Sequence, residues 1–111
     1  MVEKTVLESV ESFLSAIEKD GIPISFGIVF GSHARGNTHE WSDIDLLVVS
    51  PRFDRDRTRE DIRSLWRRVW SIDTRIEPIP CGEKEWEEDD SRAIVEIARR
   101  EGVKVKLNEP A

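Results

Sequence analysis

Two aspartates separated by one residue are the side chains best suited to chemistry in this sequence. Asp43 and Asp45 flank Ile44 at the start of an apolar, β-branched run, IDLLVV, that has the composition of a buried strand. Because successive side chains of a strand point to opposite faces, the two carboxylates are expected to share one face. They either lie at the solvated end of the strand, with Asp43 capping a turn, or bind a divalent cation such as Mg²⁺, which prefers oxygen ligands.

A candidate anion site precedes the aspartates. Gly31 ends the apolar run IPISFGIVF and permits a tight turn. Ser32 and the backbone N–H groups after it would face an anion if a short helix begins there, and Arg35 would follow one turn later, available to a phosphate. A glycine followed by a serine is also an ordinary strand-to-helix turn with a serine cap, and the two residues alone do not choose between these interpretations.

Apolar residues at helical spacing indicate three amphipathic helices that would support such a site. The first spans about residues 5–21, with Thr5 and Glu8 as a capping box. The second lies around residues 62–70, where the apolar positions at i, i+3, i+4, i+7 and i+8 are Ile62, Leu65, Trp66, Val69 and Trp70. Both tryptophans of this helix are therefore expected in the core. The third helix is expected around residues 91–100, closed by a glycine.

The strands expected between these helices predict the fold class. Residues 22–30 and 44–49 have the apolar character of buried strands. Residues 72–80 are expected to form a strand toward a sheet edge, because Pro78 and Pro80 cannot donate ladder hydrogen bonds. The closing VKVKL alternates as a short edge strand. The order of elements predicts an α/β sandwich with helices packed on a small mixed sheet.

Composition limits the function classes. The 111 residues suit a single domain, 1–111, and a net charge of −6 makes nucleic acid unlikely as a broadly bound partner. A single cysteine excludes an internal disulfide, and two histidines, His33 and His39, are too few for a zinc cluster; both are expected as solvated loop residues. No run resembles a signal peptide or a membrane span, so a cytoplasmic setting is expected, without a membrane partner.

The spacing of the two motifs resembles that of a known family. Ten residues separate Gly31-Ser32 from Asp43-Ile44-Asp45, which is the GS-x10-DxD pattern of the DNA polymerase beta-like nucleotidyltransferase superfamily. The forms GSHARG and SDIDLLV are similar to its short members, the minimal nucleotidyltransferases. The core motif covers about residues 26–50, and the order of elements matches over nearly the whole chain. The resemblance implies the nucleotidyltransferase core found in the palm of polymerase beta.

The resemblance also implies an active site. In that family the two motif aspartates hold two Mg²⁺ ions, which here would be the role of Asp43 and Asp45, and the Gly-Ser turn holds the triphosphate of ATP or another nucleoside triphosphate. A third carboxylate on a later strand completes the site, and Glu77 in RIEPIP is the best match for it. The commonest residue there is aspartate, so Glu77 departs from the pattern. It is otherwise a surface glutamate, and Asp73, of the same strand parity, is the fallback.

The implied reaction is transfer of a nucleoside monophosphate, with AMP from ATP expected, to an acceptor hydroxyl. Minimal nucleotidyltransferases are often encoded beside a HEPN protein, a helical ribonuclease-like toxin, and act as its antitoxin. The resemblance thus implies a HEPN-like protein partner, and a homodimer is the other partner considered. Two alternatives remain open: a non-catalytic antitoxin that neutralises its partner by binding, and a degenerate nucleotide sensor.

Overall fold

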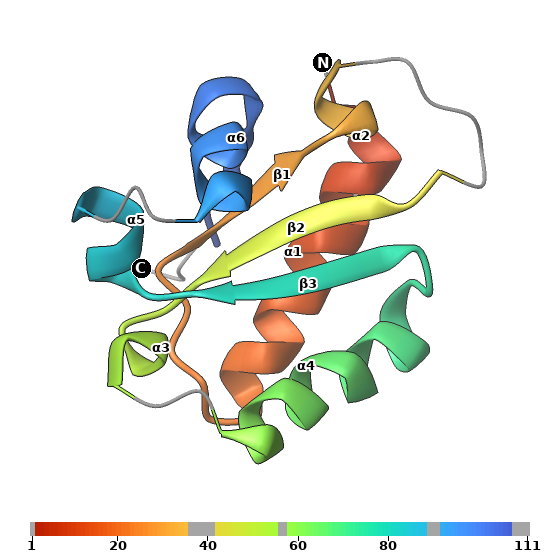
Figure 1. Ribbon diagram of the computed structural model, residues 1–111. Coiled ribbons are helices and arrows are strands. Elements are labelled where there is room, and N and C mark those ends of the chain that lie inside the picture. Colours follow the sequence, from red (N-terminus) through yellow and green to blue (C-terminus); the bar gives the residue numbers. More distant parts are fainter. Residues whose placement is uncertain (1, 36–41, 56–57, 89–91, 108–111) are drawn as a thin grey trace.

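The structure, a computed structural model, describes residues 2–35, 42–55, 58–88 and 92–107, and its four strands form one sheet in the order β3-β2-β1-β4 (Figure 1). The elements in chain order are α1 (Lys4–Lys19), β1 (Phe26–Phe30), α2 (Ser32–Arg35), β2 (Ile44–Val49), α3 (Arg52–Arg55), α4 (Arg59–Ile72), β3 (Ile76–Cys81), α5 (Glu83–Glu88), α6 (Ala93–Glu101) and β4 (Val103–Val105). The predicted α/β architecture with a small mixed sheet is confirmed.

The directions of the strands bring distant segments to one end of the sheet. Strand β1 runs antiparallel to β2 and to β4, whereas β3 runs parallel to β2. The end of β1 therefore meets the beginnings of β2 and β3. In Figure 1 this end lies on the right, together with α2, and α5 and α6 lie toward the other end.

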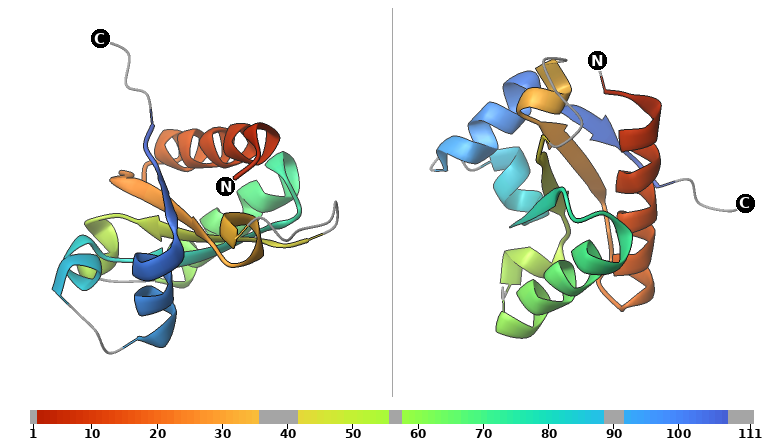
Figure 2. Two further views of the ribbon diagram at one scale, coloured as in Figure 1. Left: turned by 90° about the horizontal axis from the view of Figure 1, so that it is seen from above. Right: turned by 90° about the vertical axis from the view of Figure 1, so that its right-hand side faces the viewer.

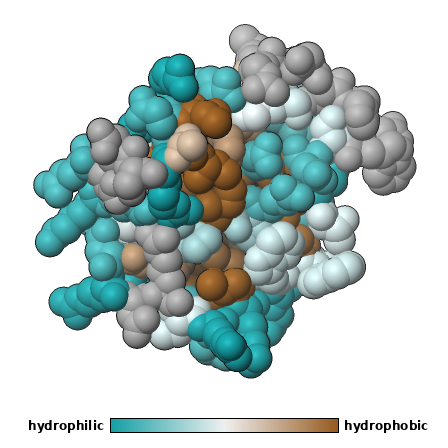
Figure 3. All heavy atoms as spheres, viewed as in Figure 1, coloured by the Kyte–Doolittle hydropathy of each residue, from teal (hydrophilic) through white to brown (hydrophobic). Residues whose placement is uncertain are grey.

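The two faces of the sheet pack against different helices (Figure 2). On β2, Ile44, Leu46 and Val48 point to the face covered by α1 and α4, where they join the larger hydrophobic cluster. The alternate residues Leu47 and Val49 point to the face covered by α6 and join a smaller cluster. Figure 3 shows this second face: hydrophobic side chains gather in its middle, beside α6, and hydrophilic ones lie around them.

Helix α4 corrects one prediction. Trp66 and Trp70, expected in the core, are exposed, and the helix instead buries Leu65 and Val69. Residues four apart lie along one row of a helix. The row that faces α1 and the sheet contains Leu65 and Val69, and the row one position further round, which contains both tryptophans, faces solvent. The apolar spacing of α4 therefore predicts the helix correctly, but the buried face that it predicts is wider than the observed one.

The boundaries of other elements also differ from the sequence predictions. Helix α1 begins at Lys4 after Glu3, without a side-chain cap, so the predicted Thr5–Glu8 capping box is wrong. Residues 22–25 precede β1 instead of belonging to it, and α4 extends through Ile72, so β3 begins only at Ile76. The edge position of β3 and the short edge strand β4 are confirmed.

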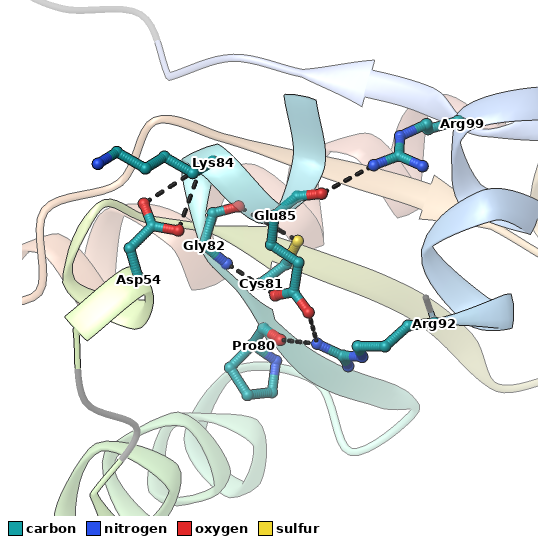
Figure 4. Close-up of polar contacts among 8 residues, drawn as sticks. All are labelled: Asp54, Pro80, Cys81, Gly82, Lys84, Glu85, Arg92 and Arg99. Carbon is teal, nitrogen blue, oxygen red and sulfur yellow. Dashed lines mark hydrogen bonds and ion pairs between the residues drawn. The ribbon is translucent and has the colours of Figure 1, made fainter. Parts of the chain in front are cut away.

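Two short helices, α3 and α5, were not predicted. Helix α5 forms within the acidic run because partners from elsewhere satisfy both of its ends (Figure 4). The Asp54 carboxylate accepts the backbone N–H of Lys84 at 3.1 Å, and the Arg99 guanidinium donates to the carbonyls of Glu85 and Trp86 at 2.8 and 2.7 Å. None of these partners is close in sequence.

In the part of the chain that the structure describes, no helix has both the length and the apolar character needed to cross a bilayer.

Candidate functional site

The predicted site residues come together at the end of the sheet where β1 stops and β2 and β3 start. In the strand register, Asp45 of β2 pairs with Phe30 of β1 on one side and with Glu77 of β3 on the other. Paired residues of neighbouring strands point to the same face. The Asp45 and Glu77 carboxylates therefore lie side by side, and Gly31 follows directly after Phe30.

Gly31 and Asp45 are in direct contact. Gly31 has φ 74°, a left-handed backbone conformation that favours glycine. A Cβ atom placed on Gly31 would lie 2.3 Å from Oδ2 of Asp45, which is closer than any real contact. The backbone conformation thus favours glycine here, and any larger residue would also displace the Asp45 carboxylate.

Three carboxylates interact at this end of the sheet. Burial raises the pKa of Glu77 above its ordinary value, and the negative charges of Asp43 and Asp45 raise it further. Glu77 is exposed as a residue, so its carboxyl group stays open to solvent beside the two aspartates. Asp43 is also exposed and lies directly before β2, which begins at Ile44 as predicted. It still shares the side of Asp45, because both act on Glu77.

The donor set fits a hard cation such as Mg²⁺ by its chemistry. The three carboxylates supply only oxygen ligands, and their mutual repulsion is the kind that a divalent cation relieves. Within the described ranges, no three histidine, cysteine, aspartate or glutamate side chains are already arranged to hold a metal ion. Closure around an ion would thus require side-chain rotation, which the exposed Asp43 and Glu77 permit.

The residues expected to hold phosphates are placed only in part. Ser32 begins α2 directly after the turn at Gly31, and it is half-buried. The backbone N–H of Ala34 donates to the carbonyl of Gly31 at 3.1 Å, which closes the turn. The side chain of Arg35 and all of His39 lie outside the described residues.

His33 is a residue whose role the sequence did not reveal. It was expected to be solvated, but it is buried, and its Nε2 donates to the carbonyl of Ser42 at 3.0 Å. This bond ties α2 to the residue directly before Asp43, so His33 fixes the entry into β2. Its position directly after the Gly31-Ser32 turn was the available signal.

Asp73, the fallback for the third carboxylate, has other partners. It precedes β3 and binds the Arg75 guanidinium through both carboxylate oxygens, at 3.0 and 2.8 Å. The Arg75 hydrogen bond and a further one from Ser9 of α1 hold the pKa of Asp73 at about 2. These contacts attach the turn between α4 and β3 to α1 and leave Glu77 as the carboxylate beside Asp45.

A mixed sheet with an acidic residue on each side of Ile44, the first residue of β2, next to a Gly-Ser turn defines a chain of the nucleotidyltransferase class. Residues 8–104 match the family described as "Nucleotidyltransferase domain", and the chain belongs to this family, within the polymerase beta-like superfamily. The resemblance stated from the GS-x10-DxD spacing is thereby confirmed.

Individual relatives are similar over part or most of the chain. The chain is 38% identical over 68 residues to "Putative protein adenylyltransferase MJ1305" of Methanocaldococcus jannaschii; the match covers 56% of this chain and 46% of that protein, so the chain spans under half of its length. The crystal structure of "a putative nucleotidyltransferase from Sulfolobus solfataricus" superimposes with a TM-score of 0.63 at 20% identity, covering 88% of this chain and 77% of that one. A crystal structure of a "toxin-antitoxin with AMP-PNP" gives 0.59 at 17% identity, covering 89% and 74%. These two structural matches establish the shared fold.

Proposed function

We propose that the chain is a Mg²⁺-dependent nucleotidyltransferase that transfers AMP from ATP to an acceptor hydroxyl. The observation that supports this most strongly is the convergence of three carboxylates on a glycine turn. Asp43, Asp45 and Glu77 interact at the end of the sheet where Asp45 contacts Gly31. Three acidic groups held together in this way are costly unless a cation or a proton neutralises them.

Each residue has a separate role in the proposal. Asp43, Asp45 and Glu77 would hold two Mg²⁺ ions, which when bound would stabilise negative charge on the attacking and leaving oxygens. The turn at Gly31 and Ser32 would present backbone N–H groups to the triphosphate, and Arg35 would add positive charge there. Glu77, on the edge strand, would stand nearest to an incoming acceptor.

A partner protein is the acceptor we propose. The archaeal relative is named as a protein adenylyltransferase, and one structure of the same fold is a toxin–antitoxin pair with an ATP analogue. By analogy, this chain would use ATP and modify a HEPN-like partner. Because the chain covers under half of that relative, its acceptor is proposed from the name and the fold together, and not from the site alone.

The test is transfer of label from [α-³²P]ATP to the candidate partner in the presence of Mg²⁺. The double variant Asp43→Asn with Asp45→Asn should lose transfer, because it keeps the shape of the side chains and removes the charges that would hold the ions. Glu8→Gln with Glu11→Gln is the matched control: it makes the same change in net charge at exposed positions of α1, on the opposite face of the sheet. Equal loss in both double variants would refute the assignment of the site.

The same variants separate the alternatives. If the chain neutralises its partner only by binding, Asp43→Asn with Asp45→Asn would still neutralise it. If the chain is a nucleotide sensor, calorimetry would show Mg²⁺-dependent binding of ATP, but pyrophosphate would not be released with any acceptor. Transfer that depends on the two aspartates excludes both.

A further inference from the structure

Three large apolar side chains lie exposed in one row along α4. Ile62 is 39% exposed, Trp66 43% and Trp70 78%, and they recur every four residues. Residues at this spacing form a ridge along the helix surface. Since an indole side chain presents up to about 250 Å², the two tryptophans leave roughly 300 Å² of mostly apolar surface in contact with water. A patch of this size matches the largest apolar patch of an ordinary monomer, and such a patch is often a functional surface.

A row of arginines runs beside this ridge. Arg59, Arg63 and Arg67 also recur every four residues and are exposed, and they lie next to the apolar row on the helix surface. Arg67 has a distant, exposed ion pair with Glu60, at 3.7 Å. Arg68 belongs to the opposite flank of α4, where both of its nitrogens bind Asp20 at the end of α1. The arginine row is therefore available to a partner, whereas Arg68 is committed to the fold.

We propose that this tryptophan face of α4, made of Ile62, Trp66, Trp70, Arg59, Arg63 and Arg67, docks an acidic amphipathic helix of a partner protein. Tryptophan and arginine are the residues most enriched at the energetic centres of interfaces. An i, i+4 ridge packs between the side-chain rows of another helix, and the adjoining arginines require acidic residues on that helix. A second copy of this chain fits less well, because a two-fold pairing of α4 with itself would bring the two arginine rows together.

The position of the face suits a partner that is also the acceptor. Helix α4 ends three residues before β3, the strand that carries Glu77, and Figure 1 shows the end of α4 beside the start of β3. A protein held along α4 is thus held at the same end of the sheet as the carboxylates, but α4 packs on the opposite face, so the part of the protein that is modified would reach the site around the edge strand β3. The proposed docking face adds a binding surface to the proposed transfer of AMP to a protein. It rests on that proposed function only for the partner's role as acceptor. Docking of an acidic helix stands without it.

The test uses two synthetic peptides of about 18 residues, long enough to be helical. Both carry leucines in one row, and the neighbouring rows carry glutamates in one peptide and lysines in the other. The glutamate peptide should bind the full chain by calorimetry, shift the tryptophan emission to the blue, and bind more weakly as salt is raised. Trp66→Ala with Trp70→Ala should weaken this binding by about tenfold or more.

Control variants separate docking from folding and from catalysis. Ile97→Ala, which truncates an exposed apolar residue of α6, should bind the glutamate peptide like the parent chain, and so should Asp43→Asn with Asp45→Asn. Equal binding of the lysine peptide, no binding of the glutamate peptide, or unchanged binding by the tryptophan double variant would each overturn the proposal. A dimer in sedimentation equilibrium that the tryptophan substitutions dissociate would assign the face to a second copy, and would overturn it too.

Discussion

Replacing Gly31 by alanine strains the backbone of the turn and also displaces the Asp45 carboxylate. A control variant separates these two effects. The new Cβ would start 2.3 Å from Oδ2 of Asp45, whereas ordinary contacts begin at 3.4 Å, so the oxygen must move by about 1 Å. This oxygen is the far end of a side chain, and its movement costs little stability. Alanine at φ 74° costs roughly 1–2 kcal/mol, which lowers Tm by about 5–10 °C in a chain of this size.

Gly21 supplies the matched control. It has φ 101°, and nothing lies within 4 Å of a Cβ placed on it. Gly21→Ala should therefore lose a similar free energy of unfolding and keep full transfer. Because a misplacement of about 1 Å in a catalytic group can reduce a rate about 100-fold, Gly31→Ala should lose transfer of labelled AMP on that scale. Thermal unfolding and transfer are measured on both variants at the same temperature. If Gly31→Ala transfers as well as Gly21→Ala, the contact with Asp45 has no part in the reaction.

Three further predictions follow from the contacts. Asp73→Asn should lower the free energy of unfolding, measured in urea at pH 6, by about 2 kcal/mol. Because the pKa of Asp73 is lowered from 3.8 to about 2, its stabilising effect is complete above pH 3.8 and disappears as the pH falls toward 2. An equal loss of stability at pH 6 and at pH 2 would contradict the ion pair. His33→Ala should cost about 1–3 kcal/mol by leaving the Ser42 carbonyl unpaired, and should slow transfer; His33→Gln, which can still donate, should recover part of both. Leu65→Ala should cost about 2–5 kcal/mol and Trp70→Ala under about 0.5 kcal/mol, and similar losses by chemical denaturation would show that Trp70 is buried in solution.

Features decided by neighbouring residues were predictable from the sequence. The bounds of β2 were read correctly because an apolar run stands between Asp43 and the pair Ser50-Pro51, where the composition changes abruptly. The edge position of β3 was also predictable, because its prolines cannot donate to two neighbours. Each of these features depends on residues close together in the chain.

Features decided by distant contacts were not predictable. The five apolar positions of α4 cover more of the helix surface than one sheet and one helix can bury, and their spacing does not say which flank is left in water. Asp61 shows the same limit: it is buried, and its Oδ1 pairs with Arg52 at 2.8 Å, although an aspartate in the first turn of a helix reads as a surface residue.

The candidate site divides in the same way. Asp43 and Asp45 were selected by their own spacing, whereas Glu77 came from family resemblance. Periodicity could not supply it, because the parallel register that sets Glu77 beside Asp45 joins strands separated by two helices. The contact between Gly31 and Asp45 depends equally on the register of β1 with β2.

The outer edge of β3 cannot recruit another strand. Ile44 donates its N–H to the Arg75 carbonyl, so the backbone groups of residues 76, 78 and 80 face away from β2. Two of these residues are prolines without an N–H, and the N–H of Ile76 is already bonded to the Asp73 carbonyl. This margin of the sheet therefore has no donor left for strand addition, so it resists the edge-to-edge aggregation that exposed strands invite. A protein approaching the site from this side must be recognised by its side chains.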